Sequence, residues 1–367
     1  MEKVASLRTI SRGIADTHYP WSSNVDDNRL RGNLMTGSSP LVSIVTPVYN
    51  CEQYLPECIE SVLAQTYQNW DYTIIDNCST DGSLAIAHKY AEQDNRIRIC
   101  KNSKHLRAIA NHNVAFRQIS PESKYSKMVF ADDWLFPQCL EEMVVLAERD
   151  SSIGIVSAYG LQGDKVMWAG LPYPSRLVSG HEVCRQFLLE DTYVFGTATS
   201  LLFRSDLIRG RDPFYDESNL HADAEACVAL SKNCHFAFAH QILTYKRVRS
   251  ESLGMLSDDI NTLIAGNLHI LIVHGADFLT PEELEICKRR QTLEYYNFLA
   301  VSLLQGRRDA KFWNYHKQKL KEDGVGFSRI RLALATLKRL GRAALNPHET
   351  LEKVNKHKNR ASLARPE

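Results

Sequence analysis

The sequence lacks the features that mark nucleic-acid-binding, zinc-binding and disulfide-rich proteins. Its 44 Lys and Arg residues are balanced by 43 Asp and Glu residues, so the formal net charge of +1 gives no general case for nucleic-acid binding. Its 9 cysteines are scattered without a Cys-x-x-Cys pair, which indicates reduced thiols and not zinc ligands or a disulfide framework. These absences favour a cytoplasmic protein whose partners are not nucleic acids.

Long apolar runs and glycine-rich phosphate loops are missing as well. The N-terminal stretch MEKVASLRTI has no signal-peptide core. The longest uncharged stretch, residues 260–276, contains Asn, Thr and His and therefore predicts a buried helix, not a membrane span. The first predicted strand is not followed by Gly-x-Gly-x-x-Gly, which argues against a nicotinamide dehydrogenase. No glycine-rich loop with Arg and Lys follows it either, which argues against a sugar nucleotidyltransferase.

A strand–helix–strand unit is the most informative part of the sequence. Residues 41–45 predict a buried strand, which should end near Pro47 because proline has no N–H for a ladder. A helical spacing of apolar side chains follows, and residues 72–75 predict the second strand. The loops 46–50 and 76–82 leave the carboxyl ends of neighbouring strands, where open α/β sheets bind ligands.

The second of these loops carries side chains that suit a nucleotide. Asp76 is a carboxylate at a strand end and can accept from the N–H of a base. Ser79, Thr80 and Gly82 offer hydroxyl and backbone N–H groups at a helix start, where phosphate binds well. The alternative is that Asp81 and Gly82 form only a turn and a helix cap.

The two loops together resemble those of the family 2 glycosyltransferases, which have the GT-A fold. The resemblance rests on Thr46-Pro47-Val48-Tyr49-Asn50 and on Asp76-Asn77-Cys78-Ser79-Thr80-Asp81-Gly82-Ser83. It implies a nucleotide-sugar donor, with UDP as the expected nucleotide and Asp76 on its uracil ring. The other residues expected at the nucleotide are Pro47, Val48, Tyr49, Asn50, Asn77, Ser79 and Asp81.

Strand and helix patterns alternate over roughly the first 160 residues, which predicts an α/β fold with a mostly parallel sheet flanked by helices. We expect a loose arm over residues 1–40 and a GT-A-like domain over 41–255. Residues 41–159 would form its nucleotide-binding half and 160–255 its acceptor half. The expected remainder is a helical C-terminal region, 256–345, and a basic, disordered tail, 346–367.

Phe130-Ala131-Asp132-Asp133 lies where the family carries an Asp-x-Asp motif. The resemblance implies that Asp132, with Asp133 beside it, binds Mg²⁺ or Mn²⁺, and that the metal and Asp132 hold the donor's diphosphate. Carboxylate oxygens are the ligands that these ions prefer. Phe130 replaces the first carboxylate of the motif. The alternative is an Asp-Asp turn before a helix.

Asp223 matches the Asp of the family's Glu-Asp pair, with Ala222 in place of the Glu. The resemblance implies that Asp223 deprotonates the acceptor hydroxyl, so that the sugar is transferred with inversion. The alternative is a carboxylate that only caps the following helix. Residues 196–200 would lie between the two sites, as an acceptor contact or as a tight strand.

The segment around Arg247 and Arg249 resembles the family's closing segment, with Arg249 in place of its usual His. Arg247 is expected to hold the diphosphate. The main prediction is a hexosyl- or N-acetylhexosaminyltransferase of polysaccharide assembly, acting on a glycan, lipid-linked or small acceptor. Because Phe130, Ala222 and Arg249 depart from the pattern, the alternative is a degenerate relative that binds nucleotide as a non-catalytic partner.

Residues 326–345 predict an amphipathic helix. Its apolar side chains Phe327, Ile330, Leu334, Leu337 and Leu345 share one side, and Arg331, Lys338 and Arg342 share another. This pattern favours peripheral contact with the inner face of a membrane. The alternative is a helix packed on the domain with a solvated basic face. The oligomeric state has no signal in the sequence.

Overall fold

The computed structural model describes residues 32, 39–168, 171–173, 175–248 and 260–345. The chain divides into two compact units. The first contains the chain up to Gly180, then Tyr193–Phe214 and Asn233–Arg247; the second contains His181–Thr192, Tyr215–Lys232 and the chain from Val248. The domain bounds expected from the sequence remain predictions, and the 1–40 and 346–367 segments lie almost entirely outside the described residues.

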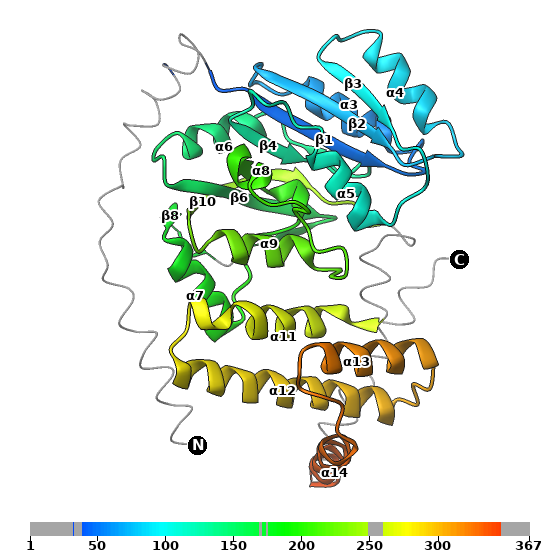
Figure 1. Ribbon diagram of the computed structural model, residues 1–367, viewed down its shortest axis with the longest axis vertical. Coiled ribbons are helices and arrows are strands. Elements are labelled where there is room, and N and C mark those ends of the chain that lie inside the picture. Colours follow the sequence, from blue (N-terminus) through cyan, green and yellow to red (C-terminus); the bar gives the residue numbers. More distant parts are fainter. Residues whose placement is uncertain (1–31, 33–38, 169–170, 174, 249–259, 346–367) are drawn as a thin grey trace. The chain divides into compact units, whose positions relative to one another are not determined.

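The first unit is built on a ten-stranded sheet with the order β3-β2-β1-β4-β9-β6-β10-β5 (Figure 1). Two further strands lie outside this order: β7 pairs with β6, and β8 pairs with β10. The strands are β1 Val42–Val48, β2 Trp70–Asp76, β3 Ile97–Lys101, β4 Tyr125–Met128, β5 Trp134–Leu135, β6 Ile153–Gln162, β7 Lys165–Met167, β8 Leu177–Val178, β9 Leu202–Arg204 and β10 His235–Tyr245. The α/β prediction is confirmed. Strands β3, β2, β1 and β4 are parallel, and β9 enters antiparallel between β4 and β6.

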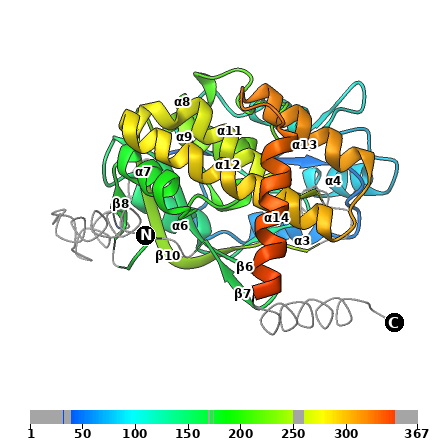
Figure 2. The ribbon, with the colours of Figure 1, turned by 90° about the horizontal axis from the view of Figure 1, so that it is seen from below.

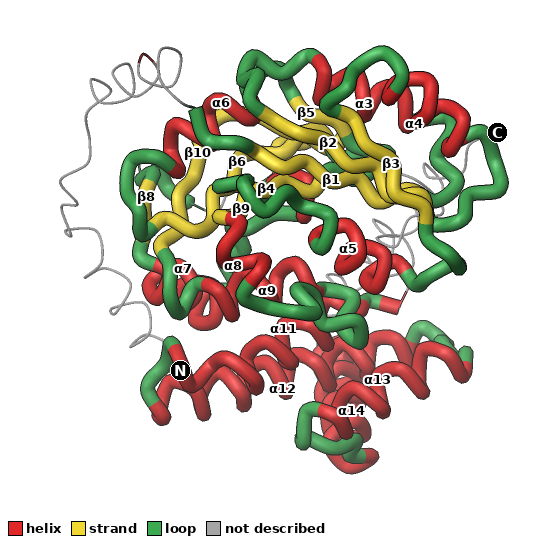
Figure 3. The backbone as a smooth tube through the Cα atoms, turned by 45° about the horizontal axis from the view of Figure 1, so that its top comes forward, coloured by secondary structure: helices red, strands yellow, loops and turns green. Residues whose placement is uncertain are grey.

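Helices cover both faces of this sheet. On one face lie α3 (Leu55–Leu63), α4 (Ser83–Ala91) and α6 (Cys139–Ala147), and their apolar sides share one core cluster with β1 and β2. On the other lies α5 (Ala108–Phe116), whose Phe116 packs edge-on against Phe203 and Phe214 (Figure 3). The short helix α8 (Ser205–Arg209) follows β9 directly. Because β3, β2, β1 and β4 are parallel, their carboxyl ends and the loops that follow them lie at one edge of the sheet.

Strand β1 ends at Val48, one residue beyond Pro47, which confirms the prediction that it ends near this proline. Val45 O accepts from Val129 N, and Val48 O accepts from Asn77 N. Because successive residues of a strand point to opposite sides, Pro47 faces the β4 side. The β1–β4 ladder ends at the pair Val45 and Met128, so no ladder bond is lost at Pro47.

Two strands of this unit are irregular. Residues 196–200, for which a tight strand was one alternative, include the 3₁₀ turn Ala198–Ser200, and only Leu202–Arg204 is extended. Strand β10 is a single strand whose register against β6 shifts after His235, Ala239 and Ile242. Such register shifts bend a strand without ending it.

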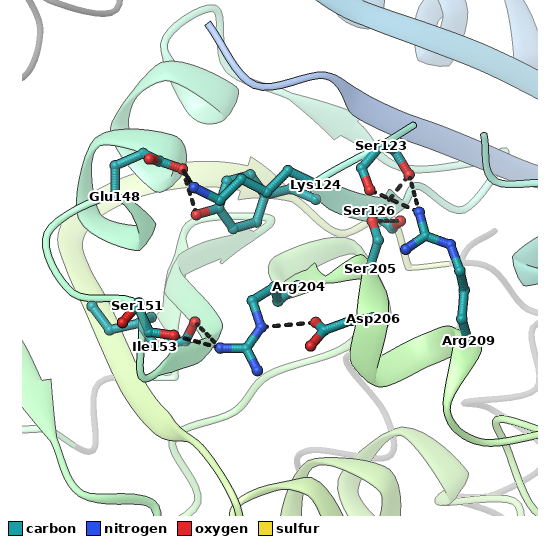
Figure 4. A network of polar contacts seen from close by, with 11 residues as sticks. Ser123, Lys124, Ser126, Glu148, Ser151, Ile153, Arg204, Ser205, Asp206 and Arg209 are labelled. Atoms are coloured by element: carbon teal, nitrogen blue, oxygen red, sulfur yellow. Dashed lines mark hydrogen bonds and ion pairs between the residues drawn. The ribbon is translucent and has the colours of Figure 1, made fainter. Parts of the chain in front are cut away.

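A polar network fixes β9 and α8 to the start of β4 (Figure 4). Ser205 Oγ lies 2.6 Å from Ser126 Oγ and 3.1 Å from Ser123 Oγ, and Arg209 donates to Ser123 O at 2.8 Å. Arg204, the last residue of β9, pairs with Asp206 of α8 at 2.7 Å. These bonds hold the antiparallel strand in place inside an otherwise parallel region.

The second unit is helical. It comprises α7 Gly180–Glu190, α9 Ala222–Leu230, α11 Thr262–His274, the 3₁₀ turn η3 Gly275–Asp277, α12 Pro281–Leu304, α13 Ala310–Glu322 and α14 Arg329–Leu345. Thr280 and Glu283 form the capping box that starts α12, as their spacing predicts. Its core joins Tyr295, Leu299 and Phe312. Among the helices that the structure describes, none is long and apolar enough to cross a membrane.

Candidate active site

The loops after β1 and β2 are tied to each other by reciprocal hydrogen bonds. Asn50 adopts a left-handed backbone conformation with φ +48°, and its Oδ1 accepts from Thr80 N at 2.8 Å. Its own N–H donates to Ser79 Oγ at 3.2 Å. One turn further on, Asp81 Oδ2 accepts from the amide of Glu52 at 3.0 Å. The structure therefore brings the two predicted nucleotide loops together and fixes them.

Asp76 ends β2 below these loops, and its side chain is only 1% exposed. Its Oδ1 accepts from Ser79 N at 3.2 Å, whereas its buried Oδ2 has no hydrogen-bond partner among the described residues. A buried carboxylate oxygen without a donor is costly and therefore rare in folded proteins. The loop thus offers one strong acceptor that a ligand's N–H can satisfy.

Asn77 is engaged by the protein itself. Its Oδ1 accepts from Asn102 Nδ2 and from Leu106 N, both at 2.9 Å, and its Nδ2 donates to Leu106 O. The side chain therefore fixes the 102–106 loop beside the nucleotide loops. Direct contact of Asn77 with a nucleotide stays a prediction.

Aromatic surface lies next to Asn77, the residue that follows Asp76. Tyr49 is 45% exposed, and its ring centroid lies 4.3 Å from that of His105, whose Nδ1 is 3.2 Å from Asn77 O. Pro47 and Val48 are buried beneath it. An exposed ring beside a free carboxylate oxygen suits a planar base, which stacks on one and donates to the other.

The turn after β4 places Asp132 and Asp133 at the same edge. Asp133 is buried; its Oδ2 accepts from Thr199 Oγ1 at 2.7 Å and its Oδ1 from Arg247 N at 3.0 Å. Burial, reinforced by the neighbouring charge of Asp132, raises the pKa of Asp133 to about 7. Asp133 therefore braces the turn, and its predicted role as a metal ligand remains untested.

Arg247 is brought to this turn, as the diphosphate prediction requires. Its Nε donates to Asp132 O at 3.2 Å and its guanidinium pairs with Glu57. The guanidinium carbon lies 4.7 Å from the Tyr54 ring centroid and 5.2 Å from that of Trp134. Arg247 is thus held by aromatic faces and a single carboxylate. Arg249 lies outside the described residues.

Sequence reasoning missed the buried cation under this turn. Lys127 is fully buried in β4, and its Nζ donates to Thr199 O at 2.7 Å and to Leu201 O at 3.2 Å. Burial lowers its pKa. A chain of contacts thus runs from Lys127 through Thr199 and Asp133 to Arg247. The only signal in the sequence is a lysine inside the short strand Tyr125–Met128.

Asp223 belongs to the second unit, in the first turn of α9. The capping position is His221, and Asp223 Oδ1 accepts from Ala224 N at 2.9 Å. The rival carboxylate, Glu225, is buried against His274, with Oε1 2.8 Å from Nε2. Asp223 is the more exposed of the two, as a base that meets substrate must be. Its catalytic role stays a prediction.

Comparison with known proteins identifies the segment that carries the first site. The family model described as glycosyl transferase family 2 matches residues 43–210. The match contains both nucleotide loops and the Asp132 turn.

Individual relatives agree with this assignment. EpsE of Bacillus subtilis (strain 168), named as a glycosyltransferase, is 32% identical over 155 residues, which are 40% of this chain and 55% of EpsE. Glycosyltransferase GlyG of Streptococcus pneumoniae serotype 4 is 34% identical over 122 residues, 33% of this chain and 40% of GlyG. The matches thus span about half of these curated relatives or less.

Solved structures show the fold over a longer stretch. The S. aureus protein TarS in complex with UDP-GlcNAc aligns over 81% of this chain and 87% of its own, with a TM-score of 0.57 and 15% identity. Its complex with UDP aligns equally far, with a TM-score of 0.56 and 16% identity. The central sheet with flanking helices and the helical C-terminal region are thus similar in fold to TarS.

Proposed function

We propose that this protein transfers a sugar from a nucleotide-sugar donor, with UDP as the nucleotide, to an acceptor hydroxyl. The observation that carries the proposal is the buried, unpartnered Oδ2 of Asp76 beside the exposed ring of Tyr49. The imide N–H of uracil supplies the missing donor and its ring a face to stack. Adenine has no imide and can offer only its exocyclic amine to the same acceptor. Similarity in fold to a protein that binds UDP-GlcNAc supports this choice.

The turn at Asp132 fits a divalent cation that the donor itself helps to bind. Asp132 supplies the carboxylate, with Asp133 behind it, and phosphate oxygens and water complete the shell that Mg²⁺ or Mn²⁺ prefers. No cluster of three or more metal-binding side chains occurs in the part of the chain that the structure describes. A metal bound here supplies neutralising charge for the departing diphosphate. Arg247 adds a fixed cation beside it.

The acceptor side of the proposal rests on Asp223. Displacement of the nucleoside diphosphate by a hydroxyl needs a base to take the hydroxyl proton, and attack opposite the leaving group inverts the sugar's anomeric carbon. The partly buried carboxylate of Asp223, which is more accessible than that of Glu225, would take that proton. A glycan, lipid-linked or small acceptor, and a hexosyl or N-acetylhexosaminyl sugar, are all compatible with this chemistry.

Measured turnover separates the proposal from non-catalytic nucleotide binding. We expect the full chain to release UDP from one UDP-sugar in the presence of Mn²⁺ and an acceptor glycan, and to stop in excess EDTA. Stabilisation by UDP without turnover on any UDP-sugar would instead support the degenerate relative. Turnover in excess EDTA would indicate that Arg247, and not a metal ion, neutralises the charge of the diphosphate.

A further inference from the structure

Helix α14 carries an apolar stripe that the rest of the described chain leaves exposed. The side chains are Ile330, 73% exposed, Leu334, 61%, Leu337, 64%, and Leu345, 81%. Their spacing of about four, three and eight residues puts them on one side of a helix. Phe327, which was expected on this side, precedes the helix and packs against the core of the second unit.

The opposite side of α14 is the one that packs. Ala335 is buried in the core of the second unit, and Leu332 is partly buried against that core. The turn before the helix is fixed by Tyr296, whose hydroxyl donates to Gly326 O at 3.1 Å and accepts from Ser328 N at 2.7 Å. Figure 2 shows α14 crossing α12. The stripe is therefore held facing outward and is not the product of a loose helix.

The charge on α14 has one sign. Residues 329–345 contain no Asp or Glu, and their basic side chains are all exposed: Arg329, Arg331, Lys338, Arg339 and Arg342. At 100° per residue, Arg331, Lys338 and Arg342 form one flank of the stripe, and Arg329 lies on the other. Apolar side chains bordered by cations are the pattern of a helix that lies in a membrane interface.

This charge decides which partner fits. A second copy of the same face would bring cations against cations with no anion to pair them. A nucleic acid would leave the apolar stripe in water. An anionic lipid surface satisfies both parts, because its headgroups attract the arginines and its acyl boundary takes up the leucines. We propose that α14 docks the protein on anionic membrane surfaces, lying parallel to them.

Sedimentation of the full chain with vesicles tests the proposal without reference to sugar transfer. The probes are vesicles of phosphatidylcholine alone and of phosphatidylcholine with phosphatidylglycerol. We expect binding only to the anionic vesicles and release at high salt. Leu334→Glu with Leu337→Glu should lower the partition coefficient at least about tenfold, because two inserting side chains are lost.

The matched control is Leu293→Glu with Leu303→Glu, which adds the same two charges at exposed leucines of α12. This control should bind as the parent does. A charge-only variant, Arg331→Gln with Lys338→Gln and Arg342→Gln, should lose the preference for anionic vesicles. Since all five of these α14 positions are exposed, thermal unfolding of both α14 variants should match the parent.

Several results would overturn the proposal. They are no sedimentation of the parent with anionic vesicles, equal binding to neutral vesicles, and equal losses in the α14 and α12 leucine variants. Self-association without vesicles that Leu334→Glu with Leu337→Glu abolishes would make the stripe an interface between copies.

Discussion

At the scale of single residues, Asp223 and Glu225 separate into different environments. Two residues apart on α9, Asp223 is partly buried and Glu225 is buried against His274. A positioned general base typically contributes about 10²–10⁴-fold to the rate. The more exposed carboxylate is the one that can meet an acceptor.

We therefore expect Asp223→Asn to cut the rate of sugar transfer at least about a hundredfold, with donor affinity unchanged. Glu225→Gln, which keeps the shape of the buried side chain, should do much less. Steady-state kinetics with UDP affinity measured alongside checks both. A nearly silent Asp223→Asn would make this residue a helix-end acceptor only, because Asn serves that role as well as Asp.

His316 gives a residue-scale prediction about pH. It is buried between Tyr295 OH and Ile260 O, each 2.8 Å from a ring nitrogen, so both nitrogens are engaged by the neutral ring. Burial lowers its pKa to about 4. The unfolded chain takes up this proton near pH 6.5, before the folded one does, so stability is lost as the pH falls from about 6.5 to 4.

The expected loss from this one group is roughly 2–3 kcal/mol of unfolding free energy across that window. Urea unfolding at several pH values measures it, with His316→Gln as the comparison because the other histidines are common to both proteins. Parallel pH profiles for the two would contradict a buried neutral His316.

At the scale of elements, the turn that carries Asp132 depends on β4 beneath it. The Lys127 ammonium bonds two carbonyls of the 199–201 turn, and Thr199 in turn bonds Asp133. Replacing Lys127 by Met leaves those carbonyls without a donor in the interior. We expect Lys127→Met to lower the unfolding free energy by about 2–3 kcal/mol.

Lys124 is the matched control, since it precedes the same strand but is half-exposed and pairs with Glu148 at the surface. Lys124→Met should cost about 1 kcal/mol or less. Thermal and urea unfolding compare the two. Equal losses of unfolding free energy would mean that the buried hydrogen bonds of Lys127 do not stabilise the turn.

The same elements show how far the sequence alone reaches. The strand–helix–strand unit, the capping box at Thr280 and the buried helix before it have local signals in spacing and turn chemistry, and the structure confirms them. The run of β1 through Pro47 depends on where β4 ends, and the single β10 depends on its register with β6. Such features are set by neighbours distant in the chain.

The site divides in the same way. Asp76 and Asp132 could be proposed as site residues from the sequence because each lies in a loop that follows a predicted strand. Lys127, Tyr54 and Glu57 reach the site only through tertiary contacts, so their spacing in the sequence carries no sign of them.

At the scale of the whole molecule, the first unit carries the predicted nucleotide site and the second unit is helical. Turnover of the proposed reaction needs the donor, the cation and the base together, so metal dependence is a property of the whole protein. We expect Asp132→Ala to abolish Mn²⁺-dependent turnover while the unfolding temperature stays unchanged, since Asp132 lies in a turn and not in the core. Full activity of this variant would show that the cation, if used, is bound elsewhere.

The central claim is that Asp76 receives the base of a uridine nucleotide, and calorimetric titration of UDP with Mn²⁺ tests it most directly. Asp76→Asn should weaken UDP binding by about tenfold to a hundredfold, the value of a charge-assisted hydrogen bond. Asp71→Asn is the control at the other end of β2, where the carboxylate accepts from Ser43 Oγ, and it should leave UDP binding unchanged. The parent should also prefer UDP to ADP. Equal binding of UDP by the parent and Asp76→Asn, or equal binding of ADP and UDP by the parent, would contradict the account.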